Sequence, residues 1–79
     1  MISDKIKGLL TINGKNVRNY CEYLGILEQA GSRKIKANTF KADELIHLAE
    51  LTGTHLAFID NKGNPVITFD VNDIPTKEK

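Results

Sequence analysis

The sequence between residues 14 and 26, GKNVRNYCEYLGI, has the pattern of a short helix enclosed by two glycine turns. Apolar residues recur in it at i, i+3, i+4 and i+7, the spacing of one helical face, and they are Val17, Tyr20, Cys21 and Leu24. Asn16 is suited to cap the first turn, and Gly25 to close the last turn in the left-handed conformation. The pattern therefore predicts a helix from about Asn16 to Leu24, followed by a sharp turn.

Helical patterns also lie on both sides of this segment. A first helix is predicted from the apolar stripe of Ile2, Ile6, Leu9 and Leu10. Ser3 or Asp4 is suited to cap its start, and Asn13-Gly14 to end it. A third helix is predicted from Leu27 to about Ala37, with inward positions at Ile26, Ala30 and Ile35. Gly31 lies near its middle, where glycine costs about 1 kcal/mol relative to alanine.

The fourth predicted helix has the clearest apolar periodicity. Asn38-Thr39 breaks the chain before Phe40, which we expect to anchor the core. The inward stripe of the helix is Ala42, Leu45, Ile46 and Ala49, broadened by Leu48 and Leu51. Asp43 and Glu44 suit the positive end of the helix dipole, and Gly53 ends the helix.

Beyond Gly53 the pattern changes to that of strands. Residues 55–60 and 65–70 are rich in β-branched and aromatic residues, and the turn formers of 61–64 separate them. We therefore expect an antiparallel β-hairpin, with Pro65 at the start of its second strand. The predicted organisation is a helical domain at 1–53, a hairpin at 54–73 packed on the same core near Leu48 and Leu51, and a flexible tail at 74–79.

The composition and charge of the chain limit the classes of function that it can have. Seventy-nine residues make one domain with one modest core. A single cysteine allows no intrachain disulfide, and neither a signal peptide nor an apolar run of about 18 residues is evident, so we expect a cytoplasmic location. Residues 1–42 hold eight basic and three acidic residues, whereas residues 43–79 hold three basic and seven acidic. This asymmetry, +5 against −4, suggests one half that faces a polyanion.

The whole pattern resembles the phage-repressor (Cro/CI-like, XRE-type) helix-turn-helix family over roughly residues 2–60. The motif carrying the resemblance is the capped helix with a small residue, Cys21, at its centre, followed by Leu24-Gly25-Ile26. The segments Ala42–Ile46 and Leu48–Gly53 resemble the fourth helix of the family. The implied fold class is mainly α, a four- to five-helix lambda-repressor-like DNA-binding domain with a C-terminal two-stranded antiparallel β-hairpin.

The resemblance implies a sequence-specific DNA-binding transcriptional regulator of bacterial or phage origin. Its second helix would cross the phosphate backbone while the third lies in the major groove. The positions that would face base edges are Glu28, Gln29, Ser32 and Arg33. The positions that would contact phosphates are Lys15, Asn16, Arg18, Lys34, Lys36 and Asn38.

A homodimer is expected through the hairpin, because an isolated two-stranded hairpin is marginal in water. One face would pack on the helices, and the other face or the open strand edge would pair with a second copy. The expected interface residues are Phe58, Ile67 and Phe69.

A second hypothesis is a protein-interaction module, such as an accessory factor of a mobile element, on a helix-turn-helix scaffold that no longer binds DNA. The departures from the family pattern favour it: Val17 replaces a phosphate-binding glutamine, Leu27 a polar cap, and Gly31 a core aliphatic residue. Arg33, Lys34 and Lys36 are equally compatible with a solvated basic face. His47 and His55 lack metal-ligand spacing, Cys21 lies on the apolar stripe and is expected to pack in the core, and no nucleophile–base pair or phosphate loop is evident. We therefore expect no enzyme activity, metal or cofactor.

Overall fold

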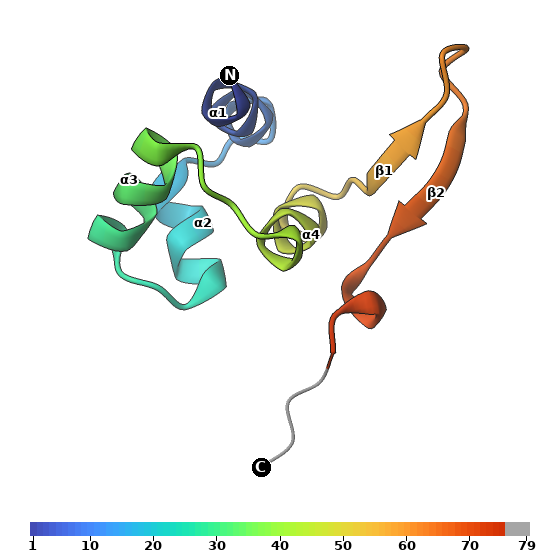
Figure 1. Cartoon of the computed structure of the whole chain (residues 1–79). Coiled ribbons are helices and arrows are strands. Elements are labelled where there is room, and N and C mark those ends of the chain that lie inside the picture. The colour runs from blue at the N-terminus through green and yellow to red at the C-terminus, as the bar shows by residue number, and fades with distance from the viewer. Residues whose placement is uncertain (76–79) are drawn as a thin grey trace.

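The computed structural model describes residues 1–75. Within them the chain is mainly helical, with four α-helices followed by a two-stranded antiparallel sheet and a short 3₁₀ helix (Figure 1). The elements are α1 (Ile2–Ile12), α2 (Val17–Leu24), α3 (Glu28–Ala37), α4 (Ala42–Leu51), β1 (Leu56–Ile59), β2 (Pro65–Phe69) and η1 (Val71–Asp73). The predicted order of four helices and a hairpin is confirmed.

Local capping explains the bounds of α2. The Asn16 side chain accepts a hydrogen bond from the Asn19 backbone N–H at 2.9 Å, and the Asn19 side chain accepts one from the Asn16 N–H at 2.9 Å. This reciprocal pair satisfies N–H groups that have no partner within the helix. Gly25 ends the helix at φ 74°, which is accessible to glycine without steric cost. Both predicted boundaries of α2 are confirmed.

The predicted cap of α1 is wrong. The helix begins at Ile2, and its N-cap residue, Met1, makes no side-chain cap hydrogen bond. Ser3 is buried, and its hydroxyl donates to the Ile35 carbonyl oxygen and the Asn38 side-chain oxygen, so it joins α1 to the end of α3. Ile2 is exposed, so the buried apolar residues of α1 start at Ile6.

The core lies where α1, α2 and α4 meet. Its buried cluster is Ile6, Leu10, Tyr20 and Leu48, and partly buried residues from every helix pack against it, including Ile35 of α3. Tyr20 donates a hydrogen bond to the Glu44 backbone carbonyl oxygen at 2.6 Å, and its ring stacks on Phe40 with centroids 6.3 Å apart. Phe40 thus packs against the core as predicted.

Contact between α2 and α3 depends on the size of two facing residues. Gly31 is buried in the middle of α3, and a Cβ atom built there would overlap the Cys21 Sγ of α2. Burial raises the pKa of the Cys21 thiol, which keeps it uncharged in this contact. The glycine that costs helix propensity therefore makes room for the cysteine.

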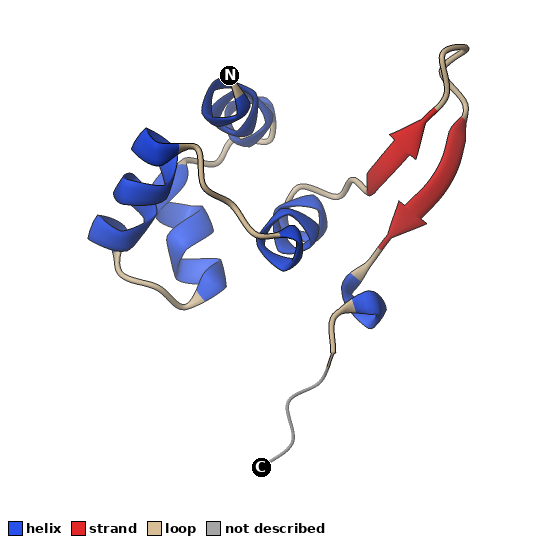
Figure 2. Ribbon diagram, in the orientation of Figure 1, coloured by secondary structure: helices blue, strands red, loops and turns tan. Residues whose placement is uncertain are grey.

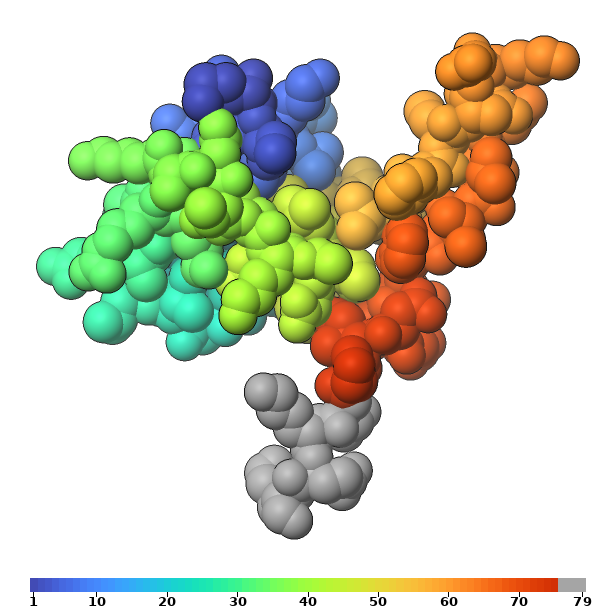
Figure 3. Space-filling view, in the orientation of Figure 1, coloured from blue at the N-terminus to red at the C-terminus, as the bar shows by residue number. Residues whose placement is uncertain are grey.

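The hairpin projects as an arm from the helical body (Figures 2 and 3). In its register Leu56 pairs with Phe69 and Phe58 with Ile67, which places these four apolar residues on one face of the sheet. Phe69 and Leu56 are half-buried at the base, whereas the exposed fractions of Phe58 and Ile67 are 67 % and 56 %. The helices therefore cover only the base of the face that we expected to pack on them.

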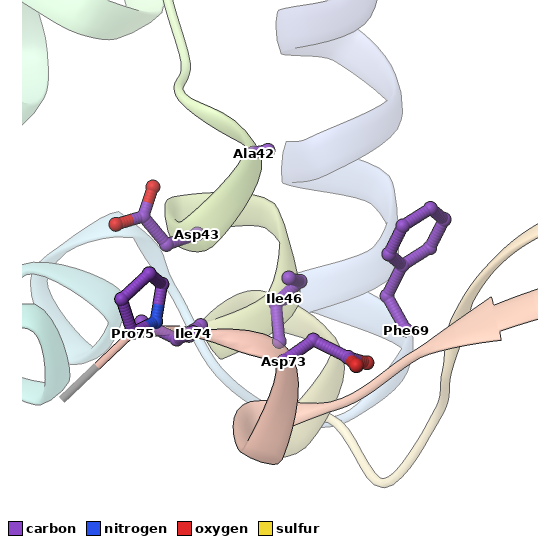
Figure 4. Close-up of a pocket in the computed structure, with 7 residues that line it drawn as sticks. All are labelled: Ala42, Asp43, Ile46, Phe69, Asp73, Ile74 and Pro75. Carbon is purple, nitrogen blue, oxygen red and sulfur yellow. The ribbon is translucent and has the colours of Figure 1, made fainter.

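Two hollows mark the place where this base meets α4. One is lined by residues of α4, β2 and η1, with Phe69 opposite Ile46, and has a volume of about 330 Å³ (Figure 4). A smaller hollow of about 90 Å³ is lined by Ile46, Ala49 and Glu50 together with Phe69 and Val71. The lining of both hollows differs from the predicted contact near Leu48 and Leu51, because Leu48 faces the helical core. Of the predicted tail, residues 76–79 lie outside the described residues, and Ile74 is half-buried beside the larger hollow.

Candidate nucleic-acid interface

The outer face of α3 carries the residues expected to reach base edges. Glu28, Gln29, Ser32 and Arg33 are all exposed, and Lys36 continues the same face one turn further. The opposite face of α3 packs against the rest of the protein, with Gly31 buried and Ile35 half-buried. The four side chains expected to reach base edges thus lie on the solvent side of α3.

Two positively charged side chains on this face have no acidic partner among the residues that the structure describes. Over residues 1–75, neither Arg33 nor Lys36 forms an ion pair. Lys34, Lys36 and Arg33 follow one another closely near the C-terminal end of the helix, where positive charge also complements the helix dipole. The charge of Arg33 and Lys36 is therefore directed to solvent or to an external anion.

Lys34 forms an ion pair that the sequence did not predict. Its ammonium group lies 2.8 Å from a carboxylate oxygen of Glu44, with only 24 % and 16 % of the two side chains exposed. Burial alone would raise the pKa of Glu44, but hydrogen bonds from Lys34 and from the Lys41 backbone N–H lower it overall. Lys34 thus ties α3 to α4, and its phosphate contact stays a prediction in which a phosphate must compete with Glu44.

Asn38 also serves the fold. It ends α3 with φ 57°, a left-handed conformation that asparagine tolerates better than most residues. Its side-chain oxygen accepts a hydrogen bond from the Ser3 backbone N–H at 2.9 Å and another from the Ser3 hydroxyl. These bonds engage only the oxygen of the side chain, so the NH2 group can still donate to a phosphate and that contact stays a prediction.

The remaining expected phosphate contacts lie around the start of α2. Lys15 is half-buried, and the side-chain oxygen of Asn16 is engaged in the α2 cap. Arg18 is exposed and lies 3.7 Å from Glu22 of the same helix. Exposed i,i+4 pairs of this kind are worth roughly 0.3–0.5 kcal/mol, so a phosphate can compete for Arg18.

One exposed residue of this region is absent from the expected contacts. Leu27 is the N-cap residue of α3, its side chain makes no cap hydrogen bond, and its exposed fraction is 75 %. The available signal was a leucine where a helix start favours a polar residue. In the sequence alone this leucine indicates only the loss of a cap.

Replacing Glu44 with glutamine tests the link between α3 and α4. The folded protein holds the pKa of Glu44 below its ordinary value. Its contribution to stability is therefore full above the ordinary glutamate pKa, about 4.3, and is lost as the pH falls through the lowered value. We expect Glu44→Gln to lower the free energy of unfolding by roughly 1 kcal/mol at pH 7 and by progressively less in acid.

Urea unfolding at a series of pH values measures this difference. Asp43→Asn is the matched control, because Asp43 is an exposed acid in the same first turn and forms no ion pair within residues 1–75. Equal effects of the two substitutions at every pH would show that the Lys34 pair contributes nothing.

Comparison with known proteins identifies no relative of this chain. No family model, no curated protein and no solved structure matches it. No helix within residues 1–75 has the length and apolar character needed to cross a membrane. The geometry of the site is therefore the basis for the function proposed below.

Proposed function

We propose that this protein is a sequence-specific DNA-binding transcriptional regulator with a lambda-repressor-like helix-turn-helix, akin to the Cro/CI-like, XRE-type family. The observation that carries the proposal is the arrangement of α2 and α3. A glycine turn joins two short helices, and the second presents an outer face of Gln29, Ser32, Arg33 and Lys36. In such a motif the second helix occupies the major groove while the first braces across the backbone.

The chemistry of the outer face fits base recognition. An exposed glutamine can pair bidentately with adenine and an exposed arginine with guanine, while serine serves either. Glu28 is repelled by phosphates but can accept a hydrogen bond from the amino group of cytosine. Lys36 and Arg18 supply charge that phosphates attract regardless of sequence.

A second copy of the chain completes the proposed regulator. The strands β1 and β2 contain no charged residue, so two hairpins can pair without like-charge repulsion. Phe58 and Ile67 offer an exposed apolar pair on one face. Phe69 is half-buried at the base, where it lines the hollow against α4, so it supports the arm more than the interface. A symmetric dimer would present two copies of α3 to successive major grooves.

Salt-titrated binding to duplex DNA tests the proposal. We expect affinity for a mixed-sequence duplex to fall linearly on logarithmic axes between about 50 and 200 mM salt. Lys36→Ala should reduce the slope by about one and Arg33→Ala should weaken a selected site about tenfold or more. Lys62→Ala is the control, because it removes the same charge from the turn of the hairpin. Equal losses of affinity for the duplex in all three variants would indicate nonspecific electrostatic attraction and count against the proposal.

The exposed hairpin also supports the competing interaction module. Its apolar surface, including Ile59 and Val66 with exposed fractions of 63 % and 70 %, suits a protein partner as well as a second copy. Failure to bind any duplex at about 50 mM salt, where electrostatic contacts are strongest, would favour this alternative.

A further inference from the structure

Leu27 is an unfavourable residue at a helix N-cap, the position that it occupies in α3. It stands at the N-cap of α3, where serine, threonine, aspartate or asparagine would accept a hydrogen bond from a free N–H of the first turn. Leucine cannot do so, and its side chain makes no cap hydrogen bond. With 75 % of its surface exposed, it adds little to the core in return. Nothing in the fold explains a leucine at this position.

The surroundings of Leu27 suit a small apolar target. Other large apolar residues with exposed side chains lie on α1, at the end of α2 and on the hairpin, whereas Leu27 alone lies in the segment 25–38. The residues that follow it on the outer face of α3 are polar, beginning with Glu28 and Gln29. A single apolar side chain among polar ones matches a point contact better than a protein interface, which needs a contiguous patch.

This inference rests on the proposed function, because it concerns what the same face of α3 contacts. The start of a recognition helix lies closest to the base edges of the major groove. The C5-methyl group of thymine is the apolar group that those edges present. We propose that Leu27 is a specificity-determining residue that packs against the C5-methyl of a thymine in the binding site.

Uracil substitution tests this contact directly, because uracil lacks the methyl group and keeps the pairing edge of thymine. A duplex is first selected from a random pool with the unaltered protein, and each thymine is then replaced singly by deoxyuridine. We expect one position at which the dissociation constant rises about fourfold, the effect of one buried methyl group. Leu27→Met should retain this sensitivity, because methionine keeps an apolar contact.

Leu27→Ser separates the contact from stability. Serine restores a polar cap, so this variant should unfold at a higher urea concentration than the unaltered protein. On the selected duplex it should bind about fourfold more weakly and lose its response to uracil at the sensitive position. A complex whose affinity is the same on every uracil duplex would overturn the inference alone. Absence of any complex with duplex DNA would overturn both the inference and the proposed function.

Discussion

Replacing Gly31 with alanine is expected to destabilise this protein, although alanine is the better helix former. The added Cβ would overlap the Cys21 Sγ, and Cys21 is buried between α2 and α3. Overpacking of this kind costs about 1–3 kcal/mol. It outweighs a gain in helix propensity of about 1 kcal/mol. We expect a net loss of about 1–2 kcal/mol in the free energy of unfolding, large for a domain of this size.

The effect of Gly31→Ala on the free energy of unfolding should change sign when Cys21 is replaced by alanine. In Cys21→Ala the sulfur is gone, and the next atoms near the new Cβ are the Cys21 Cβ at 3.8 Å and the Ile26 Cδ1 at 4.0 Å, both ordinary contacts. Gly31→Ala in that background should therefore stabilise by up to about 1 kcal/mol. The two substitutions should show a coupling free energy of about 2–3 kcal/mol.

Urea unfolding of the four proteins in this cycle measures the coupling. Gly8→Ala is the matched control, because Gly8 lies within α1 with no atom near the position of an added Cβ. It should stabilise by roughly 0.5–1 kcal/mol with or without Cys21. Additive effects of Cys21→Ala and Gly31→Ala would contradict the packing that we describe between α2 and α3.

A charge placed on the exposed face of the hairpin is expected to dissociate the proposed dimer. Phe58 and Ile67 are cross-strand partners on one face, and each symmetric dimer would bury both residues twice. Burying one such side chain is worth about 1.5–3 kcal/mol, and a lysine in its place must also be desolvated. Phe58→Lys should therefore weaken self-association at least about 100-fold.

Sedimentation equilibrium at micromolar concentration measures this effect. Thr68→Lys is the matched control, because Thr68 is exposed on the neighbouring strand position and points to the opposite face of the sheet. It should leave the dissociation constant within a few-fold of the unaltered protein. An unaltered protein that is entirely monomeric would refute the dimer. Equal losses of self-association in both variants would show that the face of Phe58 and Ile67 is not the interface.

The helices were predictable because their signals are local. Asn16 and Gly25 set the ends of α2 through bonds and dihedral angles within a few residues, and the sequence shows both. The 3.6-residue stripes of α2 and α4 likewise reveal which side is buried. η1 was missed because a three-residue 3₁₀ helix has no periodicity, and its signal is the capping side chain of Asp70.

The contacts that the sequence does not reveal join residues far apart in the chain. Ser3 has the chemistry of a cap, but its hydrogen-bond partners come from the end of α3, 32 and 35 residues away. Lys34 resembled its solvent-facing neighbours until α4 placed Glu44 beside it. A single sequence contains no signal of such pairings, so the contacts that Lys34 and Asn38 make within the fold could not be predicted.

The proposed function requires that the outer face of α3 binds duplex DNA. An amide chemical-shift titration of ¹⁵N-labelled protein with a selected duplex tests it residue by residue. We expect the largest changes at residues 15–18 and 27–36, with the hairpin turn at 60–64 unaffected. Chemical-shift changes confined to the hairpin, with none in α3 at saturating duplex, would contradict this requirement.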